Sequence, residues 1–186
     1  MVTYRSDDGF TLTELIVVVS LLGFVISAAY GAQFVLARGV DSSERQAFMS
    51  REVGAPLEFA ERVLCQQWSI DKTSPGVTPY RIKVQADTDT DDVTEEYVLE
   101  ATSDSTLVIQ SREGTAPFHT AVWSSNNHNV ASGTPLLRFF RLDGSEIPVA
   151  DFAQVYSDAY SAEVTIVTEY DGEQLSSTRR VTFRNR

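Results

Sequence analysis

The sequence predicts an α+β protein in which a long N-terminal helix packs on an antiparallel β-sheet of about six to eight short strands. Three observations lead to this fold class. Residues 15–37 carry no charge and are mostly Leu, Ile, Val, Phe and Ala. Between Met49 and Trp68, apolar residues recur at steps of three or four, the period of an amphipathic helix. From Tyr80 onward, short β-branched and aromatic runs are bounded by Gly, Pro, Asp and Ser, as is typical of strands.

The uncharged N-terminal run is long enough to cross a membrane, because a bilayer core needs about 20 helical residues. Two interpretations follow from the residues alone. A cleaved secretory signal needs a positive leader and a shorter apolar run, whereas the leader MVTYRSDDG holds one Arg and two Asp. A plain membrane anchor leaves Glu14 unexplained, because a lone carboxylate in hydrocarbon costs several kcal/mol unless it is protonated or paired.

A third interpretation rests on the stretch GFTLTEL, which begins at Gly9. It closely resembles the G-F-T-L-x-E processing motif of type IV pilins and pseudopilins. The resemblance implies that a prepilin peptidase cleaves between Gly9 and Phe10 on the cytoplasmic side, and that the new Phe10 terminus is N-methylated. It also implies a partner for Glu14, namely the terminal ammonium of an adjacent subunit. Two opposite charges in a low-dielectric bundle offset much of each other's desolvation, so Glu14 becomes an assembly residue that sets the axial register.

The helical pattern continues past Arg38 and becomes amphipathic. Its apolar stripe consists of Met49, Val53, Leu57, Ala60, Leu64 and Trp68. Pro56 removes an intrahelical hydrogen bond, so the helix should be kinked or broken near this residue. These patterns divide the chain into a leader (1–9, removed), a transmembrane and assembly helix (10–37), an amphipathic helix (38–70) and a β-rich globular domain (71–186).

Eight strands are predicted in the globular domain: Tyr80–Ala86, Glu96–Ala101, Thr106–Arg112, Thr120–Trp123, Leu136–Leu142, Glu146–Val149, Glu163–Tyr170 and Leu175–Arg184. The pairs Asp143-Gly144 and Asp171-Gly172 are tight-turn sequences that join neighbouring strands into hairpins. Residues 151–160 should form a short helix or an ordered loop. The polar stretch SSNNHNVASG, residues 124–133, is interpreted as a mobile loop.

Two further stretches resemble one branch of this family. Residues 135–147, PLLRFFRLDGSEI, resemble the PL-x-R-aromatic-aromatic stretch of J-type pseudopilins and W-type minor pilins, and residues 178–186, TRRVTFRNR, are similar to their closing strand. By this resemblance, the chain belongs to a low-copy tip complex that primes filament assembly. Glu14 is retained here, unlike in the K-type tip subunits.

Other candidate functional sites have little support in the sequence. Asp87, Asp89 and Asp91 are calcium candidates, but Asp92 and Val98 stand where an EF-hand needs glycine and glutamate, so a solvated acidic loop is the preferred interpretation. No nucleophile, metal or phosphate motif stands out, which predicts a non-enzymatic protein without a cofactor. The single cysteine, Cys65, excludes an internal disulfide.

The resemblance to type IV pilins and pseudopilins implies a minor pilin or pseudopilin of a type IV pilus, a type II secretion system or a DNA-uptake pseudopilus. The alternative is a membrane-anchored extracytoplasmic binding domain that does not enter a filament. The expected location is the inner membrane, as a single pass with a cytoplasmic N-terminus, and then the pilus or pseudopilus. The expected partners are prepilin peptidase, other pilin or pseudopilin subunits, the inner-membrane assembly platform and the lipid bilayer. The net charge of −11 argues against direct nucleic-acid binding.

Overall fold

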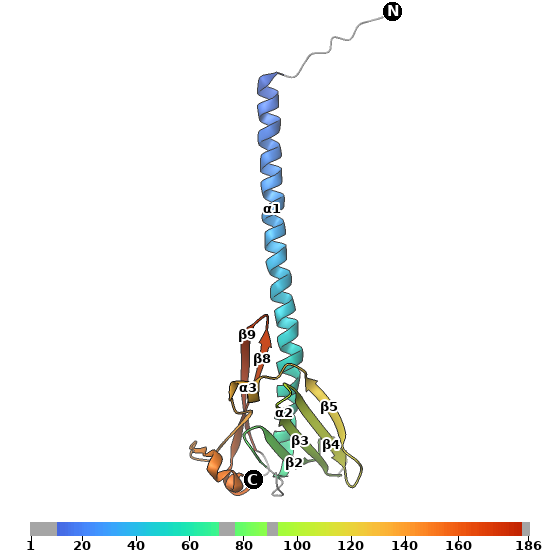
Figure 1. Cartoon of the computed structure of the whole chain (residues 1–186), viewed down its shortest axis with the longest axis vertical. Helices are drawn as coiled ribbons and strands as arrows, with labels where there is room; N and C mark the ends of the chain where they lie inside the picture. Colours follow the sequence, from blue (N-terminus) through green and yellow to red (C-terminus); the bar gives the residue numbers. More distant parts are fainter. Residues whose placement is uncertain (1–10, 71–76, 89–92, 184–186) are drawn as a thin grey trace, which may run out of the picture. The chain divides into compact units, whose positions relative to one another are not determined.

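The computed structural model describes residues 11–70, 77–88 and 93–183. The chain divides into two compact units, at residues 1–45 and 46–186, which are considered separately (Figure 1). The first unit is formed by helix α1 (Leu12–Met49), whose last four residues belong to the second unit.

Helix α1 buries none of its residues, although its first half is almost entirely hydrocarbon. By length and composition it is apolar enough to cross a membrane. Its serines do not oppose that role, because the hydroxyls of Ser20, Ser27 and Ser43 each donate to the carbonyl four residues earlier at 2.8 Å. Hydroxyls bonded within their own helix need no partner from water or lipid.

A π-helical turn, η1 (Ser50–Gly54), joins α1 to α2 (Ala55–Gln66). The N–H of Ala55 donates to the carbonyl of Ser50, five residues back. Pro56 follows in the first turn of α2 and has no N–H to offer the carbonyl four residues earlier. The expected irregularity near Pro56 therefore takes the form of a widened turn. The backbone stays helical through it, with φ −63° and ψ −55° at Gly54.

The prediction that the helix continues to residue 70 was wrong for its last four residues. Helix α2 ends at Gln66, and β1 (Gln67–Ile70) pairs with the next strand, with Ile70 opposite Val84. The apolar spacing of Trp68 fits a helix, but the sheet edge offers this segment backbone partners that a helix end lacks.

All strand pairs within the named sheets are antiparallel, and the α+β class is confirmed. The described residues form two sheets with nine strands between them, where one sheet of six to eight was expected. The first sheet has the order β1-β2-β3-β4-β5 and contains β2 (Arg81–Ala86), β3 (Glu95–Ala101), β4 (Leu107–Glu113) and β5 (His119–Ser124). The second has the order β7-β6-β8-β9 and contains β6 (Leu137–Phe140), β7 (Glu146–Ile147), β8 (Ser161–Tyr170) and β9 (Glu173–Thr182).

The eight predicted strands are all present, with ends within two residues of those expected. Both predicted turns also form: Asp171 and Gly172 have φ of 52° and 77° and connect Tyr170 directly to its cross-strand partner Glu173. Three short helical segments complete the domain: α3 (Asn129–Ser132), the 3₁₀ segment η2 (Val149–Gln154) and α4 (Val155–Asp158). For residues 151–160, where a short helix or an ordered loop was expected, the structure has the helical alternative, formed by η2 and α4.

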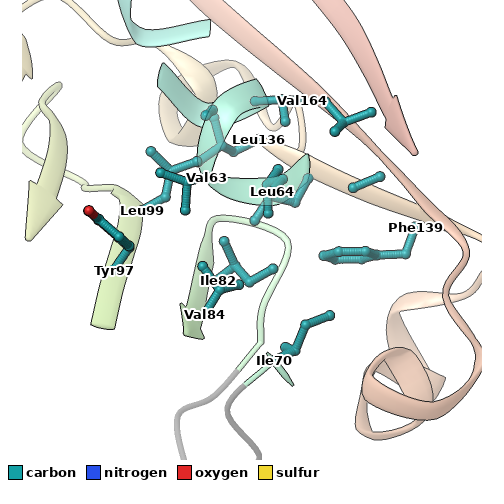
Figure 2. Close-up of a cluster of buried hydrophobic side chains, with 14 of the residues drawn as sticks. Val63, Leu64, Ile70, Ile82, Val84, Tyr97, Leu99, Leu136, Phe139 and Val164 are labelled. Carbon is teal, nitrogen blue, oxygen red and sulfur yellow. The ribbon is translucent and has the colours of Figure 1, made fainter. Parts of the chain in front are cut away.

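The predicted apolar stripe is the helical part of the core. Val53, Leu57, Ala60 and Leu64 are each less than 4% exposed. Figure 2 shows Leu64 of α2 between Ile82 of the first sheet and Phe139 of the second. Alternation places every second residue of β2 in this core, as a strand with one covered face requires. The two sheets and α2 thus share one hydrophobic cluster.

Candidate functional site

The candidate assembly residue Glu14 lies in the first turn of α1 and is held by Thr11. Its Oε2 accepts two hydrogen bonds from Thr11, one from the backbone N–H and one from the hydroxyl, each at 2.9 Å. In return, the N–H of Glu14 donates to Oγ1 of Thr11 at 3.3 Å. The carboxylate therefore has a defined position at the start of the helix while it stays exposed to other molecules.

This arrangement is a capping box, in which a threonine at the N-cap and a glutamate three residues later satisfy each other's backbone N–H groups. Glu14 was predicted as an assembly residue alone, so its capping role is an addition. The spacing of Thr11 and Glu14 in the sequence is the signal that could have revealed it. The box uses the peptide N–H of Thr11, so cleavage before Phe10 would leave it intact. Gly9 and Phe10 themselves lie outside the described residues.

The residues that follow Glu14 give the helix start an apolar surface. Leu15, Ile16, Val17 and Val18 are each more than half exposed. A carboxylate at the end of such a helix attracts a cation more strongly where the helix is surrounded by apolar surface, in lipid or among like helices, than it does in water.

The stretch PLLRFFRLDGSEI is explained by packing within the domain. Phe139 is fully buried, and its ring meets Phe152 edge-to-face at 5.4 Å. Arg138 points to the opposite face of the sheet, where it binds Glu146 of β7 and Glu163 of β8, the latter at 3.2 Å. The hydrogen bond from Arg138 lowers the pKa of Glu146. This motif thus fastens three strands of the second sheet.

The interpretation of residues 124–133 as a mobile loop was wrong for this polar stretch. Asn127 and Asn129 are at most 1% exposed. The Oδ1 of Asn129 accepts the N–H of Val167 at 2.9 Å, and its Nδ2 donates to the carbonyl of Thr165 at 2.8 Å. Asn129 fastens the segment after β5 to β8, because its amide bonds the β8 backbone on the edge opposite β9, beyond the last residue paired with β6. The side chain of Asn127 supports Asn129, since its Nδ2 donates to Oδ1 of Asn129 at 2.8 Å.

The calcium candidates do not assemble into a site within the described part of the chain. Asp87 is half-buried before the acidic loop, whereas Asp89 and Asp91 lie outside the described residues. Nearby, Oε2 of Glu95 accepts the N–H of Thr88 at 3.1 Å. Among the described side chains, no three of the His, Cys, Asp or Glu type come together as metal ligands would.

Comparison with known proteins finds a match for the N-terminal segment. A family model described as the prokaryotic N-terminal methylation motif matches residues 4–30, a range that includes Gly9, Phe10 and Glu14. No curated protein and no solved structure matches the chain. The motif implies processing by a prepilin peptidase, and proteins with this N-terminus are generally structural. The chain thus carries an N-terminal segment similar to the prokaryotic N-terminal methylation motif, and this segment begins an apolar helix that leads into an α+β domain.

Proposed function

We propose that the protein is a minor pilin or pseudopilin, a structural subunit that leaves the inner membrane to enter a pilus or pseudopilus. The observation that carries this proposal is the position of Glu14: a carboxylate held in place by Thr11 at the start of a helix whose exposed surface is hydrocarbon. In a membrane anchor that carboxylate would serve only to cap the helix, and its charge would lie unpaired beside hydrocarbon. In an assembly helix the charge has a further role, because a cation from a neighbouring subunit makes the costly carboxylate half of an ion pair.

The cation is the methylated ammonium of Phe10 on the adjacent subunit, formed after cleavage between Gly9 and Phe10. Among the described residues, both hydrogen bonds that the Glu14 carboxylate accepts use Oε2. The other oxygen, Oε1, can therefore accept the ammonium while the capping box stays closed. The proposed topology has the N-terminus in the cytoplasm and the β-rich domain outside, and the partners are prepilin peptidase, other pilin-like subunits, the assembly platform and the bilayer.

A place in the tip complex is the more specific form of this proposal. It is supported by the resemblance of residues 135–147 and 178–186 to J-type pseudopilins and W-type minor pilins. The main alternative is an anchored extracytoplasmic binding domain, and Glu14 is the feature that distinguishes the two.

The deciding experiment replaces Glu14 by Ala in the full-length chain, in cells that contain prepilin peptidase and the filament machinery. We expect incorporation into sheared filaments to fall about tenfold or more, because an ion pair worth more than about 1.4 kcal/mol is lost. Retention in the membrane should not change. Glu44→Ala is the matched control, since Glu44 is an exposed glutamate on the same helix beyond the apolar run.

Mass spectrometry of the mature protein tests the processing step. A chain that begins at N-methylated Phe10 is the expected product. A chain that starts near Ala32, or that keeps Met1, would contradict the proposal, as would normal filament incorporation of Glu14→Ala.

A further inference from the structure

The outer face of the second sheet, on the side away from the core, carries a small group of charged and aromatic residues. The pairing of the strands places Glu163 of β8 between Arg138 of β6 and Arg180 of β9. Two residues further along the same strands, and on the same face, Ser161 of β8 lies opposite Phe140 of β6. The labelled strands β8 and β9 can be followed in Figure 1.

The two arginines of this face have different environments. Arg138 is neutralised by two carboxylates, Glu146 and Glu163. Glu163 is also the direct cross-strand neighbour of Arg180, but its Oε1 is bonded to Arg138. Within the described part of the chain, Arg180 forms no ion pair with any carboxylate.

Arg180 is nevertheless held in one position. Its guanidinium carbon lies 3.9 Å from the centre of the Phe140 ring, and its Nε donates to Oγ of Ser161 at 3.2 Å. Phe140 is 8% exposed and Ser161 is 3% exposed, so both supports belong to the packed sheet. The two terminal nitrogens of the guanidinium have no hydrogen-bond partner among the described residues, and the side chain is exposed.

We propose that Arg180 is a preformed receptor for a carboxylate side chain presented by a neighbouring pilin-like subunit. A stacked guanidinium has already lost most of its rotamer freedom, so binding costs little further entropy. Its terminal nitrogens present donors in the fork geometry that fits a carboxylate. The identity of the neighbour rests on the proposed function, whereas the carboxylate chemistry rests on the geometry at Arg180.

A protein carboxylate fits this site better than an anionic membrane or a nucleic acid. Extended phosphate surfaces are bound by several cations acting together. Here one arginine has terminal nitrogens without a partner among the described residues, and it lies beside Glu163 and Glu146 on a chain of net charge −11. An extended anionic surface repels such a chain at long range. A single carboxylate on a neighbouring subunit can still form an ion pair with Arg180 at contact, because salt screens charges mainly beyond about 8 Å.

The test uses Arg180→Lys, which keeps the charge and places a reactive amine at the site. Membranes and sheared filaments from cells that make the full-length variant are treated with a carbodiimide, which joins an amine to a carboxylate only when they touch. Background is low because the chain has two lysines, Lys72 and Lys83. We expect crosslinked peptides that join residue 180 to an Asp or Glu of another subunit. Crosslinks from residue 180 to its own chain alone, such as to Glu163, overturn the proposal.

Arg179→Lys is the matched control. Arg179 is adjacent on β9 but faces the other way, and its Nη1 lies 2.6 Å from Oε2 of Glu61 on α2. This variant should give an intrachain link to Glu61 and no intersubunit link, which also shows that the reagent reaches the domain.

A second pair of variants, in which each arginine loses its charge, gives an independent test. Arg180→Gln should reduce filament incorporation about fivefold or more relative to Arg179→Gln. An equal effect of the two variants overturns the proposal. Loss of binding of Arg180→Gln to anionic vesicles, with normal incorporation, assigns the site to lipid and also overturns it. Normal filament incorporation of Glu14→Ala would instead contradict the proposed function. That outcome does not depend on the crosslinks of Arg180→Lys, so the two proposals can fail separately.

Discussion

The side-chain oxygen of Asn129 accepts the backbone N–H of Val167 at 2.9 Å, so an amide side chain takes the place of a neighbouring strand. Strand β6 pairs with β8 only as far as Val164. Beyond that point, the edge of β8 opposite β9 is bonded by Asn129, by the backbone of Leu136 and His128, and by the bridge between Asn127 and Thr168. This contact ties the segment after β5, in the first sheet, to the second sheet.

Asn129→Ala should lower the free energy of unfolding of the domain by about 2–4 kcal/mol. The substitution leaves the N–H of Val167 and the carbonyl of Thr165 buried without partners, and each such group costs about 1–3 kcal/mol. Denaturant unfolding of the full chain in detergent measures the change. Ser125→Ala, at an exposed position in the same stretch, is the control and should change it by less than about 0.5 kcal/mol. Equal stability of the two variants would show that the stretch does not join the sheets.

Glu52→Met should stabilise the domain by about 1–2 kcal/mol, because a buried carboxylate that is only partly satisfied opposes folding. Glu52 is 5% exposed, and its Oε1 is bonded to Nε of Arg51 at 3.0 Å. Its Oε2 is buried and has no hydrogen-bond partner in the described structure. The measurement is the same unfolding experiment, with Glu58→Met on the exposed side of α2 as control. A loss of stability in Glu52→Met would mean that this oxygen has a partner in the native protein.

The stability that Glu96 contributes should disappear in acid. Burial alone would raise its pKa, but hydrogen bonds from Arg112, Gln85 and Lys83 outweigh burial, and the pKa is lowered. The bond from Nε of Arg112 to Oε2 is 2.6 Å long. A lowered pKa means that the contribution is fully present above the unfolded value of about 4.3 and is lost as the pH falls through the folded value.

We therefore expect Glu96→Gln to be less stable than wild type by roughly 2 kcal/mol at pH 7. The difference should shrink below about pH 4.3 as the wild-type carboxylate becomes protonated. Unfolding curves of both chains between pH 7 and pH 3 test this. Glu113→Gln, at the exposed end of β4, serves as control. A difference that stays constant with pH would refute the ionic origin of the effect.

Thr11→Ala should loosen the first turn of α1 while leaving the rest of the helix unchanged. The substitution removes the hydroxyl that bonds Glu14, and loss of an N-cap costs about 1 kcal/mol. Amide exchange of residues 12–15 in micelles should accelerate about fivefold, since 1 kcal/mol is close to that factor in an opening equilibrium. Thr11→Ser keeps the hydroxyl and should restore the wild-type rate. Unchanged exchange in Thr11→Ala would show that the capping box is not formed in the membrane environment.

Local patterns in the sequence predicted most of the elements, because each depends on neighbouring residues. The spacing of Val53, Leu57 and Leu64 identified the buried stripe of the helix, and Asp171-Gly172 identified the turn between β8 and β9. Glu14 stood out because a charge within an apolar run is rare. The capping partner Thr11 was equally local and could have been recognised from its spacing.

The apolar helix, the methylation motif and the individual strands follow from the order of residues alone, since periodicity and turn chemistry act over a few residues. Packing in three dimensions decided that residues 67–70 form a strand, that the strands divide into two sheets, and that Asn129 fastens one to the other. It also decided that Arg138 is neutralised while Arg180 is not. These outcomes depend on which distant backbone and side-chain groups meet, and contacts between residues far apart in the chain leave no period in the sequence.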